Sequence, residues 1–515
     1  MKFLKWFTAV IAIVLVVFFT ALLWPMPELE PPAKHSSILI RSVNIVDVKT
    51  GNVLMNQDVL IRDNKIVAID SLGLLEPELN SITIDGSNKY LIPGLWDMHT
   101  HSNQHSPWLH HPLYIANGVT GIRDMSGQLD QRDSYWVGST ERLQWEAEMN
   151  AYTRVAPRHV LQSSYQIDGP ASVPEGFPEF FQLSSPSQVD SLLQFYADEK
   201  VDFIKVYQQI PVESYLKLAE RAERYGLHLA GHKPMFVDLA TAVRLGQRSF
   251  EHGRIFFFES FPDAELLRDT LNWKQNFSSS KRRILEEFDP EIAKSLMELM
   301  KTERAYWVPT LQTLKFEAYA HQEAFKDNPN LQYISRIRKS LWWNYDTNKN
   351  AERNTEGPSK GLSEGFYKSL LQQVNMANEL GVPIMAGTDV TDSYTFAGFS
   401  LHQELIDLNT AGLSPLEALQ SATLVPAQYV NKQGLYGSVE IGKMADLVLL
   451  NKNPLEDISN TSNIYGVIAN GLYYDTEKLE QLKEFSESAA SSFHINVKVF
   501  YGLIGSPLIR VQFAD

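Results

Sequence analysis

Leu91-Ile-Pro-Gly-Leu-Trp-Asp-Met-His-Thr-His101 is an apolar run that passes through Pro93 and Gly94 and ends in two histidines, His99 and His101. In a β-strand, residues i and i+2 point to the same face, so both imidazoles are expected to project together from the C-terminal end of a buried strand. Two imidazoles placed in this way can bind a metal. A His-x-His pair also occurs at capped strand ends and in solvated turns, so the metal interpretation depends on ligands at later strands.

Strand-like runs alternate with helical patterns along the chain. The candidate strands are residues 94–101, 118–125, 158–164, 201–207, 227–232, 248–253, 305–311 and 382–389. Helical patterns lie between them, for example at residues 212–225, 237–245 and 366–380. Eight strands that alternate with helices predict an α/β fold, the (β/α)8 TIM barrel.

Short alternating strands flank the barrel near both ends of the chain, and we expect them to combine into a small β-sandwich domain. The predicted chain begins with an apolar segment at 1–24 and a linker at 25–37. The small β domain is built from residues 38–90 and 433–475, with the barrel at 91–432 between them, and an extension follows at 476–515. The role of the extension is unknown. It contains a charged helical stretch followed by two β-like runs, 495–501 and 508–513.

Two stretches between strands are longer than a βα unit requires. Residues 259–301 follow the sixth strand and residues 315–362 follow the seventh, and both are rich in aromatic and charged residues at helical spacing. Loops after barrel strands stand over the active-site face, so these insertions are expected to cover or shape a substrate pocket. Packing against the barrel, or a surface for dimerisation, explains them almost as well, and a homo-oligomer is left open.

The composition excludes several classes of function. The formal net charge is −15 and the sequence pI is about 5.4, which argues against nucleic-acid binding, because phosphate neutralisation needs clustered Lys and Arg. The chain contains no cysteine. Disulfides, thiolate catalysis and Cys-based zinc sites are therefore excluded, and imidazole and carboxylate remain as metal ligands.

The N-terminal segment predicts contact with a membrane. Residues 6–24 carry no charge, and as a helix they would span about 28 Å, close to the hydrocarbon thickness of a bilayer. Lys2 and Lys5 precede the run and Glu28 and Glu30 follow it, so the positive-inside rule predicts an exported body, periplasmic in a Gram-negative cell. A secreted body after signal cleavage is the alternative. The uncleaved anchor is favoured, because the run exceeds a usual signal-peptide core and lacks a small-x-small cleavage site after it.

Polar residues in the later strands supply further candidate ligands. The fourth strand carries Lys205 within an apolar run, the fifth ends at His232, the sixth contains His252 and the eighth ends at Asp389. Burial would push the lysine toward its neutral amine, which can react with carbon dioxide to form a carbamate able to bridge two metals. Each residue alone has a simpler explanation, such as a solvated lysine, a core histidine or a helix cap. Their conjunction at one rim of one barrel is far more specific.

In this order and at these strand ends, the set resembles the binuclear metal site of the amidohydrolase superfamily, in its imidazolonepropionase-like and prolidase-like branch. Further stretches carry the same resemblance over residues 38–475, among them 91–99, 118–120, 386–389, 412–423 and 437–448.

The resemblance implies a role for each ligand. His99, His101 and Asp389 would hold a buried metal, His232 and His252 a more exposed one, and carboxylated Lys205 would bridge the two divalent ions together with a hydroxide. Zinc is the default for nitrogen and oxygen ligands, with manganese, cobalt and iron left open. The hydroxide would attack a scissile carbonyl, and Asp389 would pass its proton to the leaving amine.

Substrate contacts are predicted with less support. Tyr207 lies two residues after Lys205 on the same strand face and could donate a hydrogen bond to the substrate carbonyl or its oxyanion. Arg123 could pair with a substrate carboxylate through its guanidinium group. The alternatives are a packed barrel tyrosine and a structural arginine beside Asp124.

The leading hypothesis is a membrane-anchored, binuclear metal-dependent amidohydrolase that cleaves an amide or peptide bond in a small-molecule substrate, such as a dipeptide or an N-acyl amino acid. An esterase, lactonase or phosphotriester hydrolase would use the same site, and a noncatalytic binding protein is the hypothesis from another class. Deamination ranks lower, because the deaminase branch has a glutamate where this chain has Met235 and lacks the bridging lysine.

Overall fold

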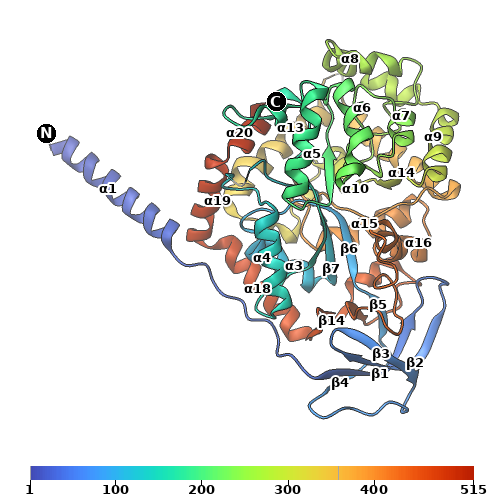
Figure 1. Cartoon of the computed structure of the whole chain (residues 1–515). Coiled ribbons are helices and arrows are strands. Elements are labelled where there is room, and N and C mark those ends of the chain that lie inside the picture. Colours follow the sequence, from blue (N-terminus) through green and yellow to red (C-terminus); the bar gives the residue numbers. More distant parts are fainter. Residues whose placement is uncertain (1, 131, 358, 515) are drawn as a thin grey trace.

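The computed structural model describes residues 2–130, 132–357 and 359–514. A central barrel is ringed by helices, a small β-sheet lies beside one end of it, and the N-terminal helix α1 (Lys2–Leu23) extends away from this body (Figure 1). The C-terminal helices run along the side of the body that α1 approaches.

Eight parallel strands form the barrel. Seven are β6 (Leu95–Thr100), β7 (Val119–Asp124), β8 (Arg158–Gln162), β9 (Phe203–Val206), β10 (His228–Gly231), β11 (Ser249–Glu251) and β12 (Tyr306–Val308). The eighth is an extended segment around Ile384. Parallel pairing joins β6, β7 and β8 in one run and β9 to β12 in another. Single parallel bridges close the ring at Ser163 and Phe203, at Trp307 and Ile384, and at Thr100 and Val390. The predicted barrel is therefore confirmed.

The strands read as nearly continuous apolar runs because helices cover the outside of a parallel barrel. Every residue of β6, β7 and β9 is buried. The helices that follow the strands are α2 (Ser106–Leu109), α3 (His111–Ala116), α4 (Ser139–Asn150), α5 (Val189–Asp198), α6 (Val212–Arg221), α7 (Leu239–Arg244), α10 (Leu311–Tyr319), α14 (Leu362–Leu380), α15 (Phe399–Ala411), α16 (Pro415–Ser421) and α17 (Leu424–Tyr429).

Both long insertions contain helices, as their residue spacing predicts. After the sixth strand come α8 (Trp273–Glu286) and α9 (Pro290–Thr302), and after the seventh come α11 (Glu323–Lys326), α12 (Arg336–Arg338) and α13 (Asn344–Thr355). Asp289 caps α9 by accepting hydrogen bonds from two backbone N–H groups of its first turn.

Strands from both ends of the chain combine into one sheet. Its members are β1 (Ser37–Val46), β2 (Val53–Arg62), β3 (Lys65–Ser71), β4 (Ile82–Asp85), β5 (Tyr90–Pro93), β13 (Leu447–Leu450), β14 (Ile464–Ala469) and β15 (Leu472–Tyr474). The central pairing is between β5 and β13, in which Ile92 opposes Val448. The chain passes from β5 through Gly94 directly into β6, so the first barrel strand starts at the seam between sheet and barrel.

The C-terminal extension corrects one expectation. It consists of three helices, α18 (Thr476–Ser491), α19 (Phe493–Gly505) and α20 (Pro507–Ala514), whereas two of these segments were expected to be β-like. In α19, Ile495, Val499 and Leu503 recur at the helical spacing of four and are all buried on one face. Packing of this face against the body outweighs the β preference of its branched side chains.

His402 predicts how stability depends on pH. On α15, its Nε2 donates to the carbonyl of Asn117 at 3.0 Å and its Nδ1 lies 3.0 Å from Thr461 Oγ1. Burial lowers the pKa of His402 to about 4 in the folded chain. In the unfolded chain His402 has its ordinary pKa, so on acidification it is protonated there before it is protonated in the folded chain. The contribution of neutral His402 is present above the ordinary pKa and is lost as the pH falls toward 4.

We expect a His402→Gln variant to lose less stability on acidification than the parent. The drop in unfolding free energy between neutral pH and the pKa of about 4 should be smaller in the variant by about 1–3 kcal/mol. Urea denaturation of the detergent-solubilised chain at the two pH values measures this difference. Equal drops in both proteins would contradict the prediction.

Candidate metal centre

The predicted ligands all lie at the C-terminal rim of the barrel. His99 lies in β6 and His101 directly after it, Lys205 lies in β9, His232 and His252 follow β10 and β11, and Asp389 lies at the end of the eighth strand. Because the C-terminal ends of parallel strands meet at one edge, residues far apart in sequence converge there.

His99, His101 and Asp389 form one compact group. Asp389 Oδ1 lies 2.9 Å from His101 Nε2 and 3.3 Å from His99 Nε2, and the two imidazole Nε2 atoms are 3.3 Å apart. All three ligand atoms fall within 4.8 Å of one another. These distances suit a single metal ion bound by two imidazoles and a carboxylate.

His232 and His252 form a second group beside the first. Their Nε2 atoms are 3.1 Å apart, and His252 Nδ1 lies 3.6 Å from Asp389 Oδ2. Thr310 Oγ1 lies 2.8 Å from His252 Nδ1 and holds the ring in place. The rings of His99 and His252 have centroids 4.8 Å apart, so the two groups lie side by side and Asp389 reaches both.

The tautomer of His99 suits a cation at the first group. Its Nδ1 lies 2.9 Å from Glu251 Oε2, and that carboxylate also accepts from a guanidinium group, so Nδ1 donates the hydrogen. The Nε2 atom therefore presents a lone pair toward His101 and Asp389. Lone pairs that face one another at about 3 Å repel unless a cation or a proton lies among them. The donor set thus fits a divalent metal.

Burial keeps the histidines neutral, as metal ligands must be. Burial is the largest cause that lowers the pKa of His99, His101 and His232, and it lowers the pKa of His252 to about 4. For Asp389, burial acts to raise the pKa, but the electrostatic interaction with His252, the hydrogen bond to His101 and the charge of Lys205 together outweigh it and hold the pKa below its ordinary value. Asp389 is therefore a carboxylate at neutral pH.

Lys205 lies on β9, beside the strand that leads to His232. Its side chain is buried, and its charge contributes to the lowered pKa of all four ligand histidines. Burial lowers the pKa of Lys205 itself to about 8, against the attraction of Asp389 and Glu251. An amine with this pKa has an appreciable neutral fraction near pH 7, which is the form that carbamate formation requires.

The backbone at two of the ligands is strained. His252 and Asp389 adopt φ values of 69° and 61°, in the left-handed region that costs a branched or bulky residue about 1–3 kcal/mol. Neighbouring glycines provide the room. A Cβ on Gly387 would lie 2.9 Å from His99 Cβ, and one on Gly231, beside His232, would lie 2.2 Å from a backbone oxygen of β9. Such strain concentrates at functional sites.

Arg123 is placed differently from the sequence interpretation. Its guanidinium is fully buried. The group donates hydrogen bonds to both oxygens of Glu251 at 2.7–2.8 Å, to Ser249 Oγ at 2.8 Å and to the Met98 carbonyl at 2.6 Å. With its donors used in this way, the side chain supports Glu251 from beneath the site. This arrangement favours the alternative of a structural arginine over a partner for a substrate carboxylate.

Tyr207 and Lys233 flank His232. The ring of Tyr207 has its centroid 4.1 Å from the ring of His232, and Lys205 Nζ lies 5.9 Å from the Tyr207 centroid, so the phenol stands beside the second group of ligands. Lys233 instead pairs with Glu259 at 2.5 Å, inside the insertion after the sixth strand. Its charge is thereby matched by that carboxylate.

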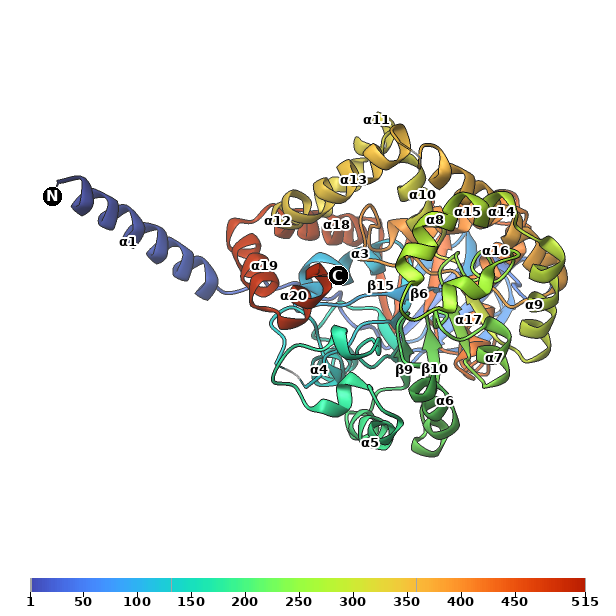
Figure 2. The same cartoon turned by 90° about the horizontal axis from the view of Figure 1, so that it is seen from above.

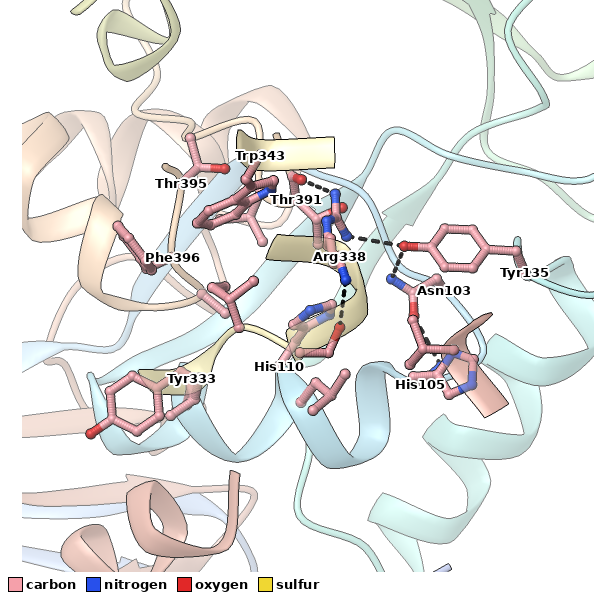
Figure 3. A pocket seen from close by; sticks show the side chains of 17 residues that line it. Asn103, His105, His110, Tyr135, Tyr333, Arg338, Trp343, Thr391, Thr395 and Phe396 are labelled. Carbon is pink, nitrogen blue, oxygen red and sulfur yellow. Dashed lines mark hydrogen bonds between the residues drawn. The ribbon is translucent and has the colours of Figure 1, made fainter. Parts of the chain in front are cut away.

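A pocket lies next to the loops that carry the first ligand group (Figure 3). Asn103, two residues after His101, and Thr391, two residues after Asp389, both line it. Arg338 of α12 projects between them and donates to the Thr391 carbonyl and, at 3.0 Å, to Tyr135 Oη. The insertion after the seventh strand is therefore tied to the loops that position the ligands.

Sequence reasoning missed two carboxylates that support the ligands. Glu251 orients His99, and Asp97 accepts a hydrogen bond of 2.6 Å from Thr388 Oγ1 and thereby joins the first strand to the eighth. Burial raises the pKa of Asp97 to about 7. The sequence does contain a signal for both, because each is a carboxylate inside an apolar strand: Glu251 directly precedes His252, and Asp97 lies two residues before His99.

Comparison with known proteins agrees with this geometry. Residues 367–472 match the family model of the Amidohydrolase family. A segment of 261 residues, 47% of this chain, is 26% identical to adenine deaminase from Staphylothermus marinus and spans 40% of that enzyme's length.

Solved structures share the fold over most of the chain. Bottromycin amidohydrolase superposes with a TM-score of 0.68 at 21% identity, over 88% of this chain and 91% of that one. A Xaa-Pro dipeptidase with methionine bound in its active site superposes with a TM-score of 0.59 at 20% identity, over 85% of this chain and 100% of that one. These likenesses support the barrel with its small β-sheet.

The contact between Glu251 and His99 predicts weaker metal binding when its charge is removed. A Glu251→Gln variant should lose about 10- to 100-fold in metal affinity, because a partner that orients a ligand histidine contributes about this much. Metal retained against chelators of graded strength measures the change.

Asp58→Asn is the matched control, since Asp58 is a buried carboxylate that pairs with Arg41 at 3.0 Å in the small sheet. This control should lose stability but keep the parent's metal affinity. Equal metal affinity in Glu251→Gln and the parent would show that Glu251 does not orient a ligand.

Proposed function

We propose that the chain is a metal-dependent hydrolase of the amidohydrolase superfamily that cleaves the carbon–nitrogen bond of a small dipeptide or N-acyl amino acid. The observation that carries the proposal is the convergence of four neutral imidazoles, Asp389 and a buried lysine at one barrel rim. The six residues fit a binuclear site with carboxylated Lys205 as the bridge, and zinc suits their nitrogen and oxygen donors.

Two bound divalent ions would supply Lewis acidity toward a substrate carbonyl and a water of lowered pKa as nucleophile. His99 and His101 with Asp389 would hold one ion, and His232 with His252 the other. The neutral state of the histidines, imposed by burial, leaves their lone pairs available.

Asp389 would move the proton. Its oxygens face both ligand groups, at 2.9 Å from His101 Nε2 and 3.6 Å from His252 Nδ1. With one oxygen toward each group, the carboxylate can accept a proton from the attacking water and return it to the leaving amine. Tyr207, beside His232, would donate a hydrogen bond to the developing oxyanion.

Hydrolysis of an amide is preferred to deamination. Lys205 occupies the bridging position, and Met235, which is buried, stands where the resemblance to deaminases would require a glutamate. The names of the similar proteins include both a deaminase and dipeptide-cleaving or amide-cleaving proteins, so this preference rests on the site residues.

We further propose that α1 anchors the enzyme in a membrane with the barrel outside the cytoplasm. Residues Phe3–Leu23 form a helix that is long and apolar enough to cross a bilayer, and almost none of it is buried against the body. Lys2 and Lys5 at its start and Glu28 and Glu30 after its end orient it with the N-terminus in the cytoplasm. A cleaved signal segment would have the same composition.

Metal content tests the binuclear site. The detergent-solubilised chain, prepared with zinc and bicarbonate, should bind two metal ions and release amine from members of a dipeptide library. In Lys205→Ala, the loss of the bridge should reduce the content to one ion or fewer and lower the rate of hydrolysis by at least about 100-fold, a barrier increase of about 2.7 kcal/mol.

Lys233→Met is the matched control, because Lys233 is also a buried lysine at the barrel rim, after β10, but pairs with Glu259. It should keep two metals. One metal or none in the parent, with Lys205 dispensable, would overturn the binuclear mechanism. Ester hydrolysis without amide hydrolysis would redirect the assignment to an esterase.

Tyr207→Phe tests the oxyanion contact. Loss of the phenol should lower kcat by about 100-fold while KM and metal content stay near those of the parent, because the contact is stronger in the transition state. Tyr215→Phe removes another buried tyrosine, whose hydroxyl donates to Gln247 at 3.0 Å, and should leave kcat unchanged. An unchanged kcat in Tyr207→Phe would assign that ring to packing.

A further inference from the structure

Helix α19 is apolar on both of its faces. One face, with Ile495, Val499 and Leu503, is buried against the body. On the other face Phe493, Tyr501 and Ile504 are 64%, 49% and 52% exposed. A helix that is apolar all round is stable in water only when both faces are covered. The outer face of α19 therefore needs a partner.

The charge around this helix is unlike that of the rest of the chain. The chain carries 61 Asp and Glu residues and a net charge of −15, yet the sequence has neither residue type from Ser488 to Ala514. The charged residues in that span are Lys498 and Arg510. A surface that is apolar, weakly basic and free of carboxylates suits the interface of a phospholipid bilayer.

The position of α19 in the fold points to the same partner. The end of α1 lies against α19 in both views (Figures 1 and 2), with Ala21 buried and Lys498 Nζ donating to the carbonyl of Leu22 at 2.5 Å. If α1 spans the bilayer, Leu22 lies at its outer boundary, because the apolar run ends at Trp24. A helix bonded to that residue lies at the same level.

We propose that the outer face of α19 lies in the outer interface of the bilayer, as a second contact between the enzyme and its membrane. The inference rests on the proposed role of α1 as an anchor and is independent of the reaction. Phe493 and Ile504 enter the acyl boundary, and Tyr501 suits the headgroup level, where an aromatic ring with a polar end is favoured. The two contacts together fix the orientation of the body, which α1 alone would leave free to swing.

The buried face of α19 transmits this orientation to the barrel. Asn496 Oδ1 accepts a hydrogen bond of 3.0 Å from the backbone N–H of Ile337, in the helix α12 that also carries Arg338. Val499 lines the pocket that Arg338 shares with the loops after His101 and Asp389. The pocket wall and the proposed membrane contact are thus opposite faces of one helix.

The absence of native cysteine allows a direct test in the full chain. The variants Ile504→Cys and Phe493→Cys each contain a single cysteine, which is labelled with an environment-sensitive fluorophore. Each labelled protein is reconstituted into phosphatidylcholine vesicles that contain an acyl-chain nitroxide lipid. Leu271→Cys, 90% exposed near the start of α8, is the matched control, and Phe7→Cys reports on α1.

We expect the nitroxide lipid to quench the labels at positions 504 and 493 at least about threefold more strongly than the label at 271, with iodide in the water showing the opposite order. Labels on α19 that respond to iodide as position 271 does would overturn the proposal. So would labels shielded from both quenchers, which indicates a second copy of the chain as the partner. An unquenched label at position 7 would remove the anchor and the inference with it.

Neither activity nor bound metal enters this measurement, so its failure is distinct from a failure of the proposed reaction. Ile504→Glu adds a functional readout in the same vesicles. Its charge should shift a label at Tyr501→Cys from lipid to water quenching, while hydrolysis by the detergent-solubilised chain stays at the parent's rate. An unmoved label would count against the proposal.

Discussion

The buried ion pair between Arg123 and Glu251 determines how the candidate metal centre is arranged. Burial raises the pKa of Glu251, Arg123 opposes that rise, and Glu251 in turn fixes the ring and the tautomer of His99. Removing one partner of such a pair leaves an unmatched buried charge, which costs about 3–5 kcal/mol. The barrel therefore uses a strand-to-strand ion pair to aim a lone pair at the point where His101 and Asp389 meet.

Strain at the rim complements this support from below. His252 and Asp389 are held in left-handed backbone conformations, and Gly231 and Gly387 allow the neighbouring strands to approach closely. The packed barrel supplies the stability that tolerates such strain, and the ligands gain positions that an extended strand end would not provide. Rigid placement of this kind is what a metal site with defined geometry requires.

The barrel and the convergence of the six candidate ligands at its rim could be predicted from the sequence, because each candidate is a polar side chain in or directly after an apolar strand. The support of His99 could not, since Glu251 lies 152 residues away and meets His99 only across the closed barrel. Arg123 could be interpreted either as a partner for a substrate carboxylate or as a structural arginine, because its own partner Glu251 is also distant in sequence. In α19 the β-branched residues suggested strands, and only the body packed against Ile495 and Val499 decides for a helix.

The same tertiary dependence links the two ends of the chain. Leu22, at the end of the apolar N-terminal helix, and Lys498, in the C-terminal extension, are 476 residues apart and share a hydrogen bond. If α1 served only to tether the barrel, the hydrogen bond between Leu22 and Lys498 would not be needed, because residues 25–37 already connect α1 to the body as an extended linker. A fixed contact becomes useful when the body must keep one face toward the bilayer. The apolar outer face of α19, with its inner face on the pocket wall, is the surface that would meet that requirement in the proposed membrane contact.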